Sequence, residues 1–167
     1  MVEFQPYINK AKTLVEALPY IQRFWDKMVV VKYGGAAMTD PRIKATVMQD
    51  IALKKLVGMH PVVVHGGGPE INANLNKMQI ESHFVDGLRV TGPEAMEVVE
   101  MTLSGKVNKA IVTDIETQGV KAVGISGKDG GLLKAQKIHK PNGVDYGCGG
   151  DVVSVDPSLV QSLIRDG

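Results

Sequence analysis

The sequence has 167 residues, 44% of them hydrophobic and 22% charged, a balance typical of a folded globular domain. A formal net charge of +1 gives no electrostatic reason to expect nucleic acid or an anionic membrane as a partner. The apolar runs are too short for a membrane span, charges interrupt the N-terminal stretch where a signal peptide needs an apolar core, and the single cysteine, Cys148, excludes an internal disulfide. We therefore expect a cytoplasmic domain. No Cys/His spacing indicates a metal site.

Residues 4–26 predict an amphipathic helix. Its apolar side chains recur every three or four residues: Phe4, Ile8, Ala11, Val15 and Leu18. Pro19 interrupts this pattern, so we expect the helix to bend or split there. Because this helix precedes the first core strand, its apolar stripe has no obvious partner in an α/β core. It either folds back onto its own domain or packs on another subunit.

A buried strand is predicted at residues 28–33, ending at Lys32 and the pair Gly34 and Gly35. Asp40 and Pro41 then indicate the start of a helix to about residue 57, and a second strand follows at residues 61–65. This order describes a right-handed βαβ unit with parallel strands. Ligands bind beyond the carboxyl ends of such strands, which is where Lys32 is expected.

Three glycines, Gly66, Gly67 and Gly68, follow the second strand, and Pro69 then begins a predicted helix to about residue 79. The free N–H groups and the positive end of the helix dipole predict an anion or phosphate site at this glycine loop. A plain tight turn is the alternative. Together with Lys32, the two glycine loops suit a phosphoryl group, whose transfer depends on positioning and charge stabilisation.

Residues 80–92 alternate apolar and polar side chains around Asp86 and Gly87, which predicts a β-hairpin folded over the strand ends as a lid. Arg89 is the only arginine in this hairpin and can hold a carboxylate through two parallel hydrogen bonds. An exposed surface arginine is the alternative interpretation.

The rest of the chain continues the α/β pattern. We expect a helix over residues 93–117, bent near Ser104 and Gly105, a third core strand at 120–125, a hairpin of strands 132–138 and 151–155 on the edge of the sheet, and a last helix after Asp156. Asn108 and Lys109 are interpreted as structural or solvated residues on the long helix. Lys128, in the glycine-rich loop after residue 125, either contacts an anion or is an ordinary loop lysine.

Five motifs in this order resemble the acetylglutamate kinases of the amino acid kinase family. They are KYGGAAM (residues 32–38), HGGGP (65–69), DGLRVT (86–91), VNK (107–109) and GISGKDG (124–130). The resemblance implies an α/β fold: a three-layer α/β/α sandwich with a mostly parallel open sheet. It also implies transfer of the γ-phosphoryl group of ATP to the side-chain carboxylate of N-acetyl-L-glutamate, with Mg²⁺, in arginine biosynthesis.

The resemblance assigns roles by motif. Lys32 would stabilise charge on the transferring phosphoryl group, and Gly34, Gly35 and Gly66 would lie near the phosphates. Gly67 and Gly68 would bind the substrate through backbone N–H groups, and Arg89 would bind its α-carboxylate.

Acetylglutamate kinases continue into a nucleotide-binding half whose motifs do not occur by Gly167. We therefore expect residues 27–167 to be the acetylglutamate-binding, N-terminal domain, inactive by itself, and residues 1–26 to be an oligomerisation element. The N-terminal helix resembles the one that interlaces arginine-inhibited members into hexamers, so feedback inhibition by arginine is an expectation for the whole enzyme.

Three alternatives remain. A dinucleotide-binding module is disfavoured, because Ile71 stands where the last glycine of Gly-x-Gly-x-x-Gly is required. A non-catalytic sensor or assembly domain would explain the unpartnered N-terminal helix. Other members of the same family act on carbamate, aspartate, glutamate or uridylate.

Overall fold

A computed structural model describes residues 4–141 and 143–167 of the chain. Its centre is a parallel pair of strands, β1 (Met28–Tyr33) and β2 (His60–His65), in which Lys32 lies opposite Val64. The connection between them contains a short helix that the sequence analysis did not predict, α2 (Ala36–Thr39), and the long helix α3 (Pro41–Leu56). The predicted α/β class and the βαβ unit are therefore confirmed.

Helix α3 begins where its capping residues predict. The Asp40 carboxylate accepts a hydrogen bond of 2.8 Å from the backbone N–H of Arg42, and Pro41 occupies the first turn, where its missing N–H costs nothing. The buried residues Met48 and Ile51 then face the main core.

The main core lies on one face of the parallel strands, between Tyr33 of β1 and the helices α3 and α6 (Asn108–Glu116). Its buried members are Tyr33, Met48, Ile51, Val107, Ile111 and Ile115. Because side chains alternate along a strand, Val30 and Lys32 belong to the other face, and both are exposed, as is Val64. One face of the strand pair is thus covered by helices, and the other carries exposed apolar side chains.

The glycine loop leads into α4 (Gly68–Lys77), and the predicted hairpin follows as β3 (His83–Val85) and β4 (Leu88–Val90). Its turn residues, Asp86 and Gly87, have φ of 50° and 77°, the two left-handed conformations that an Asp-Gly hairpin turn requires.

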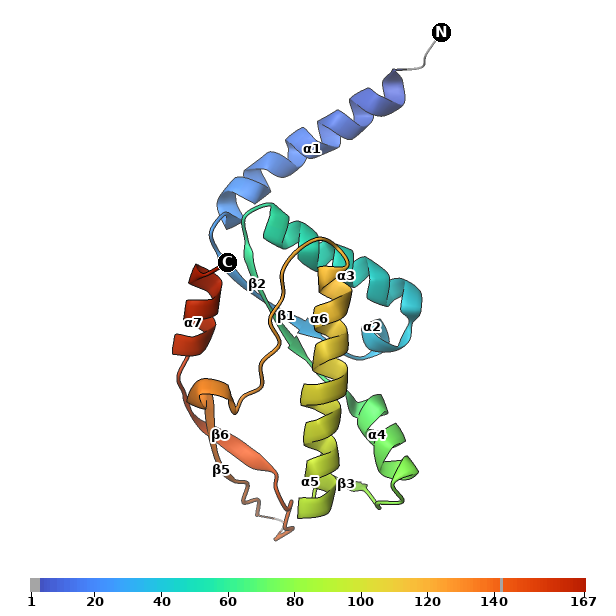
Figure 1. Cartoon of the computed structure of the whole chain (residues 1–167), viewed down its shortest axis with the longest axis vertical. Coiled ribbons are helices and arrows are strands. Elements are labelled where there is room, and N and C mark those ends of the chain that lie inside the picture. The colour runs from blue at the N-terminus through green and yellow to red at the C-terminus, as the bar shows by residue number, and fades with distance from the viewer. Residues whose placement is uncertain (1–3, 142) are drawn as a thin grey trace.

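The next helical rod consists of α5 (Pro93–Glu100), the π-helical segment η1 (Met101–Val107) and α6, stacked end to end in Figure 1. The π-helical segment contains Ser104 and Gly105, where a bend was predicted. A second buried cluster joins α4 to α5 through Ile71, Leu75, Ala95 and Val98.

The prediction of a third core strand at residues 120–125 is wrong, because the structure assigns no strand there. Val120 and Ala122 still pack against the main core, as their apolar pattern requires. A strand also needs a hydrogen-bonded neighbour. A cavity of about 370 Å³ is lined by residues 120–125, by β2 and by α7 (Ser158–Arg165). Residues 120–125 therefore do not pair with β2.

The second hairpin forms, but its predicted place on the edge of the sheet is wrong. Strands β5 (Leu133–Lys137) and β6 (Gly150–Val155) pair with each other as a separate two-stranded sheet, and every residue in them is exposed. Before them, the chain makes a short 3₁₀ turn, η2 (Asp129–Gly131). After them, the Asp156 carboxylate accepts a hydrogen bond of 3.0 Å from the N–H of Ser158 at the start of α7.

Helix α1 (Gln5–Phe24) projects away from the rest of the molecule (Figure 1). It continues through Pro19 without splitting and contains no buried residue, so it does not fold back onto its own domain. Its exposed large apolar side chains, with Phe4 just before it, are Phe4, Tyr7, Ile8, Leu14, Val15, Leu18, Tyr20 and Phe24. Among the described residues, no helix is both long and apolar enough to cross a membrane.

Candidate anion-binding site

The two glycine-containing strand ends lie side by side. The backbone N–H of Gly66 donates a hydrogen bond of 3.1 Å to the carbonyl oxygen of Tyr33, so the glycine loop starts next to the end of β1. Gly34 and Gly35 follow Tyr33 directly, and Gly35 has a φ of +60°, which favours glycine. Gly34, Gly35 and Gly66 are therefore brought together at one edge, as the sequence analysis predicted.

Lys32, the residue before the last of β1, belongs to the uncovered face of the strands. It is exposed, and no ion pair or hydrogen bond of its side chain is found among the described residues. Its neighbour Tyr33 points into the core, where its hydroxyl donates to the carbonyl of Ala37 at 3.0 Å. No described contact links the Lys32 ammonium to the glycine loop, so their approach to a shared anion stays a prediction.

Gly67 caps α4, and Gly68 and Pro69 form its first turn. The N–H groups of a first turn have no partner within the helix and lie at the positive end of the helix dipole. A Cβ on Gly67 would lie 2.6 Å from Cδ2 of Leu103, whereas nothing lies within 4 Å of one on Gly66 or Gly68. Gly67 thus packs closely against η1, whereas the space beside Gly66 and Gly68 is open.

Glu70 in the same first turn forms an ion pair with Lys106 of η1, with 2.5 Å between Oε2 and Nζ. The hydrogen bond from Lys106 lowers the pKa of the Glu70 carboxyl below its ordinary value. The carboxylate is therefore ionised at neutral pH, and its charge is balanced by Lys106.

Arg89 lies on β4 and is half-buried, and its role in binding a carboxylate stays a prediction. One terminal guanidinium nitrogen donates to the Ser82 hydroxyl, and the other donates to Oδ1 of Asn72 at 2.6 Å. The guanidinium carbon lies 4.5 Å from the centre of the Phe84 ring. Asn72 is about one helical turn beyond Gly68 on α4, so the Arg89 cation is held beside the helix that begins in the glycine loop.

A cluster of polar side chains beside the glycine loop, in which Asn108 is buried, was not predicted as part of the site. Nδ1 of His65 lies 2.9 Å from the carbonyl oxygen of Gly66, and Nε2 lies 3.3 Å from Nδ2 of Asn108. The Asn108 amide also donates to the carbonyl of Ile125 at 3.4 Å, and the Lys109 ammonium donates to the carbonyl of Gly124 at 2.8 Å. The cluster therefore links the end of β2 to residues 124–125. Its residues fall within three of the motifs noted in the sequence: His65 in HGGGP, Asn108 and Lys109 in VNK, and Gly124 and Ile125 in GISGKDG.

Lys128 forms an ion pair of 2.6 Å with Glu100 at the end of α5. In its loop, the Asp129 carboxylate accepts hydrogen bonds from the backbone and hydroxyl of Ser126, and the bond from the backbone N–H lowers the pKa of Asp129. These contacts describe an ordinary structured loop, in agreement with the second interpretation of Lys128.

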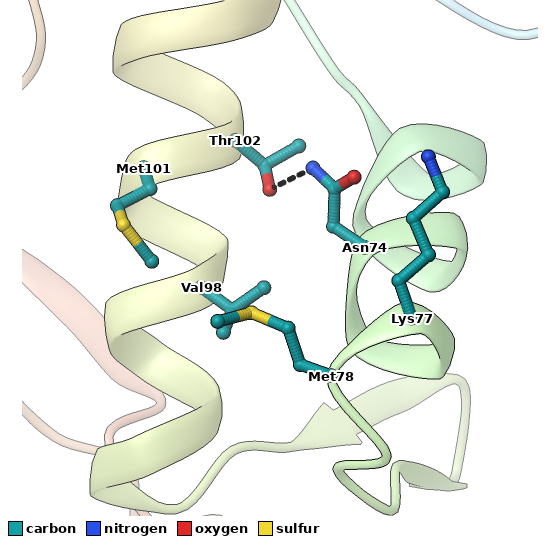
Figure 2. A pocket seen from close by; sticks show the side chains of 6 residues that line it. All are labelled: Asn74, Lys77, Met78, Val98, Met101 and Thr102. Atoms are coloured by element: carbon teal, nitrogen blue, oxygen red, sulfur yellow. Dashed lines mark hydrogen bonds between the residues drawn. The ribbon is translucent and has the colours of Figure 1, made fainter.

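A separate hollow of about 240 Å³ lies between α4 and the rod of α5 and η1, as Figure 2 shows. Inside it, the amide of Asn74 donates to the buried hydroxyl of Thr102 at 2.9 Å, and Met78 points towards Val98. None of the predicted site residues lines this hollow, so it is distinct from the candidate anion-binding site.

The structure is an α/β domain with a candidate anion site, formed by parallel strands, a glycine loop at a helix start and nearby cations. Comparison with known protein families identifies the class of protein to which it belongs. The family model of the amino acid kinase family matches residues 27–167, so the chain belongs to that family.

Within the family, the chain is 55% identical to the acetylglutamate kinase of Heliobacterium modesticaldum over 168 residues and 56% identical to that of Syntrophomonas wolfei over 161 residues. Each alignment covers 96% of this chain, but only 57% and 55% of the respective relatives. The chain thus spans little more than half the length of these relatives.

Solved structures support the same fold. The chain resembles an N-acetylglutamate synthase from Neisseria gonorrhoeae, solved with coenzyme A and N-acetyl-glutamate, with a TM-score of 0.74 over 93% of this chain and 35% of that one. It also resembles the protein smu.665 from Streptococcus mutans, with a TM-score of 0.64 over 83% of this chain and 55% of that one. The sequence identities are 20% and 24%, so these likenesses concern the fold alone.

Proposed function

We propose that this chain is the acceptor-binding part of an acetylglutamate kinase, which transfers the γ-phosphoryl group of ATP to N-acetyl-L-glutamate in arginine biosynthesis. The observation that carries the proposal is the identity of 55–56% to acetylglutamate kinases across 96% of the chain. The arrangement of the strand ends, the glycine loop and Arg89 supports it independently, because each supplies groups that bind anions.

The proposed reaction needs no covalent enzyme intermediate. An oxygen of the side-chain carboxylate forms a bond to the γ-phosphorus, while the bond from that phosphorus to the bridging oxygen of ADP breaks. The products are an acyl phosphate and ADP. Catalysis then depends on positioning the two anions and stabilising the charge on the transferring group.

Lys32 is the residue that we propose to stabilise this charge, because it is a cation without a described partner at the carboxyl end of β1. Gly34, Gly35 and Gly66 are proposed to place backbone N–H groups near the phosphates. This assignment is supported by the hydrogen bond between Gly66 and Tyr33, which sets the two loops side by side.

The acceptor is proposed to bind beside the start of α4. Gly67 and Gly68 would offer backbone N–H groups to it, and the guanidinium of Arg89 would bind its α-carboxylate. The support for this assignment is the hydrogen bond from Arg89 to Asn72, which places the cation about one turn from these glycines.

ATP is proposed as the phosphoryl donor, on the strength of the kinase relatives. Magnesium was expected with it, but among the described residues no group of three or more His, Cys, Asp or Glu side chains gathers to hold a metal ion. Mg²⁺ is proposed to bind together with ATP in the whole enzyme, and no residue of this chain is proposed as its ligand. A cytoplasmic location stays a prediction.

The function is tested with the full-length protein that contains residues 1–167. Incubation with ATP and N-acetyl-L-glutamate should release ADP, and hydroxylamine should trap an equal amount of acyl hydroxamate, which distinguishes acyl phosphate formation from ATP hydrolysis. Carbamate, aspartate, glutamate and uridylate are the matched control acceptors. Turnover with one of these, and none with N-acetyl-L-glutamate, would assign the protein to another member of the family.

We further propose that α1 packs against α1 or the core of another subunit. All of its residues are outside the core, although the helix carries a stripe of large apolar side chains. Such a surface is typical of an interface between subunits. A hexamer and inhibition by arginine are proposed for the whole enzyme, on the resemblance of this helix alone.

A further inference from the structure

We infer that Asn72 and Phe84 are positioning residues that hold the Arg89 guanidinium in its substrate-binding orientation before the substrate arrives. The inference rests on the proposed function, in which Arg89 binds the α-carboxylate of the acceptor. It adds two residues that do not belong to any of the recognised motifs, one on α4 and one on β3.

Arg89 keeps free hydrogen-bond donors after it has bound Asn72 and Ser82. A guanidinium has five N–H donors in one plane. Oδ1 of Asn72, at 2.6 Å, and the hydroxyl of Ser82 each take one, from different terminal nitrogens. The remaining donors include one on each terminal nitrogen and the Nε–H, which is enough for a two-point contact with a carboxylate. Asn72 and Ser82 therefore orient the guanidinium and leave enough of its donors free to bind a carboxylate.

The Phe84 ring lies against the Arg89 guanidinium. The guanidinium carbon lies 4.5 Å from the ring centroid, within the range in which an aromatic face attracts a cation. The ring covers one face of the guanidinium and limits its tilting. The hydrogen bonds to Asn72 and Ser82 fix the direction in which the guanidinium points. Because a flexible arginine side chain loses conformational entropy on binding, a group held in advance binds a carboxylate more tightly.

The contacts of Asn72 and Phe84 with Arg89 lie outside both buried clusters. Asn72 and Phe84 are exposed, and neither belongs to a buried cluster. Asn72 joins α4 to the hairpin through Arg89, and Phe84 contacts Arg89 from the paired strand of the hairpin. Truncating them should therefore change substrate binding much more than folding.

The test uses the full-length protein. Asn72→Ala should raise the KM for N-acetyl-L-glutamate by about tenfold, and leave the KM for ATP and the kcat within about twofold, because the loss acts through a binding residue. Asn76→Ala is the matched control, since Asn76 is an exposed asparagine one turn further along α4. Phe84→Leu should also raise this KM, and Phe84→Tyr should restore it, because tyrosine retains the aromatic face.

A double-mutant cycle separates positioning from a structural role. In an Arg89→Ala background, Asn72→Ala should cause no further increase in KM, because a residue that acts only through Arg89 has nothing left to position. Equal effects in both backgrounds, or a lower Tm with an unchanged KM, would overturn the inference.

A crystal structure of the Asn72→Ala protein gives a readout that does not require activity. We expect the Arg89 guanidinium to leave the position found here, and an unmoved guanidinium would also overturn the inference. If the wild-type protein does not phosphorylate N-acetyl-L-glutamate, the proposed function fails, and the crystal structure still decides whether Asn72 fixes Arg89.

Discussion

The last residue of β2 and the first residue of α6 meet through their side chains, with 3.3 Å between Nε2 of His65 and Nδ2 of Asn108. Asn108 is 9% exposed, and its amide also donates to the carbonyl of Ile125. Since a buried polar group is costly unless it is hydrogen-bonded, this cluster ties the segment before the glycine loop firmly to α6. Asn108, which was not predicted as part of the site, thus links the end of β2 to α6 beside the glycine loop.

The first prediction concerns Gly124, which packs against this cluster. A Cβ there would lie 1.9 Å from Oδ1 of Asn108 and 2.9 Å from Cγ2 of Val112, so Gly124→Ala must displace a buried amide. We expect this change to lower the free energy of unfolding by about 1–3 kcal/mol. Gly105→Ala is the control, because nothing lies within 4 Å of its Cβ. Thermal unfolding measures both, and a Gly124→Ala protein as stable as the control would contradict the close packing.

The second prediction concerns the proposed role of Lys32. Lys32→Ala in the full-length protein should lower kcat by about 10²–10³-fold and change the KM for N-acetyl-L-glutamate little, because the lost charge matters most in the transition state. Lys27→Ala is the matched control, since Lys27 is an exposed lysine before the amino end of the same strand. Steady-state kinetics with both substrates varied gives the answer. An unaltered kcat would remove Lys32 from the chemistry.

The third prediction is a pH dependence at the start of α4. The hydrogen bond from Lys106 lowers the pKa of Glu70 in the folded protein from its ordinary value of 4.5. The pair therefore contributes stability above pH 4.5, and this contribution is lost as the pH falls through the lowered pKa of the folded state. Because both side chains are about half exposed, we expect at most about 1 kcal/mol.

Lys106→Gln tests this pH dependence. The variant should be slightly less stable than the wild type at neutral pH and equally stable well below the lowered pKa, where Glu70 is protonated in both states. Lys121→Gln is the control, because Lys121 is exposed and forms no ion pair among the described residues. Denaturant unfolding over a series of pH values measures the difference. A constant difference between variant and wild type across the series would argue against the Glu70–Lys106 pair.

The fourth prediction concerns assembly through α1. Deletion of residues 1–24 removes the helix and leaves Trp25 and Asp26, which contact the core through Gly58 and His60. We expect light scattering to show a smaller oligomer after the deletion, and Val15→Glu to have the same effect, because it places a charge on the apolar stripe. Lys12→Glu changes the charge of the helix outside that stripe and is the control. An oligomer of unchanged mass after deletion would exclude the assembly role.

The local elements could be predicted because their signals are local. The cap at Asp40, the glycines after β2 and the Asp86–Gly87 turn each lie within a few residues of the element that they determine. The segment 120–125 and the second hairpin show the limit of this reasoning. The apolar pattern of residues 120–125 predicts packing against the core, which Val120 and Ala122 show. Whether this segment or the hairpin pairs with another strand depends on the arrangement of the whole sheet.

The sequence by itself determined the βαβ unit, the hairpin turn and the edge at which Gly34, Gly35 and Gly66 gather, because backbone conformation and capping follow from neighbouring residues. Only the tertiary structure decided that Asn72 and Phe84 hold Arg89 and that Asn108 reaches His65. These pairs consist of side chains from different elements, and their contact depends on how α4, α6 and the hairpin pack. The spacing of residues along the chain predicts contacts within one element, but not which side chains of different elements meet.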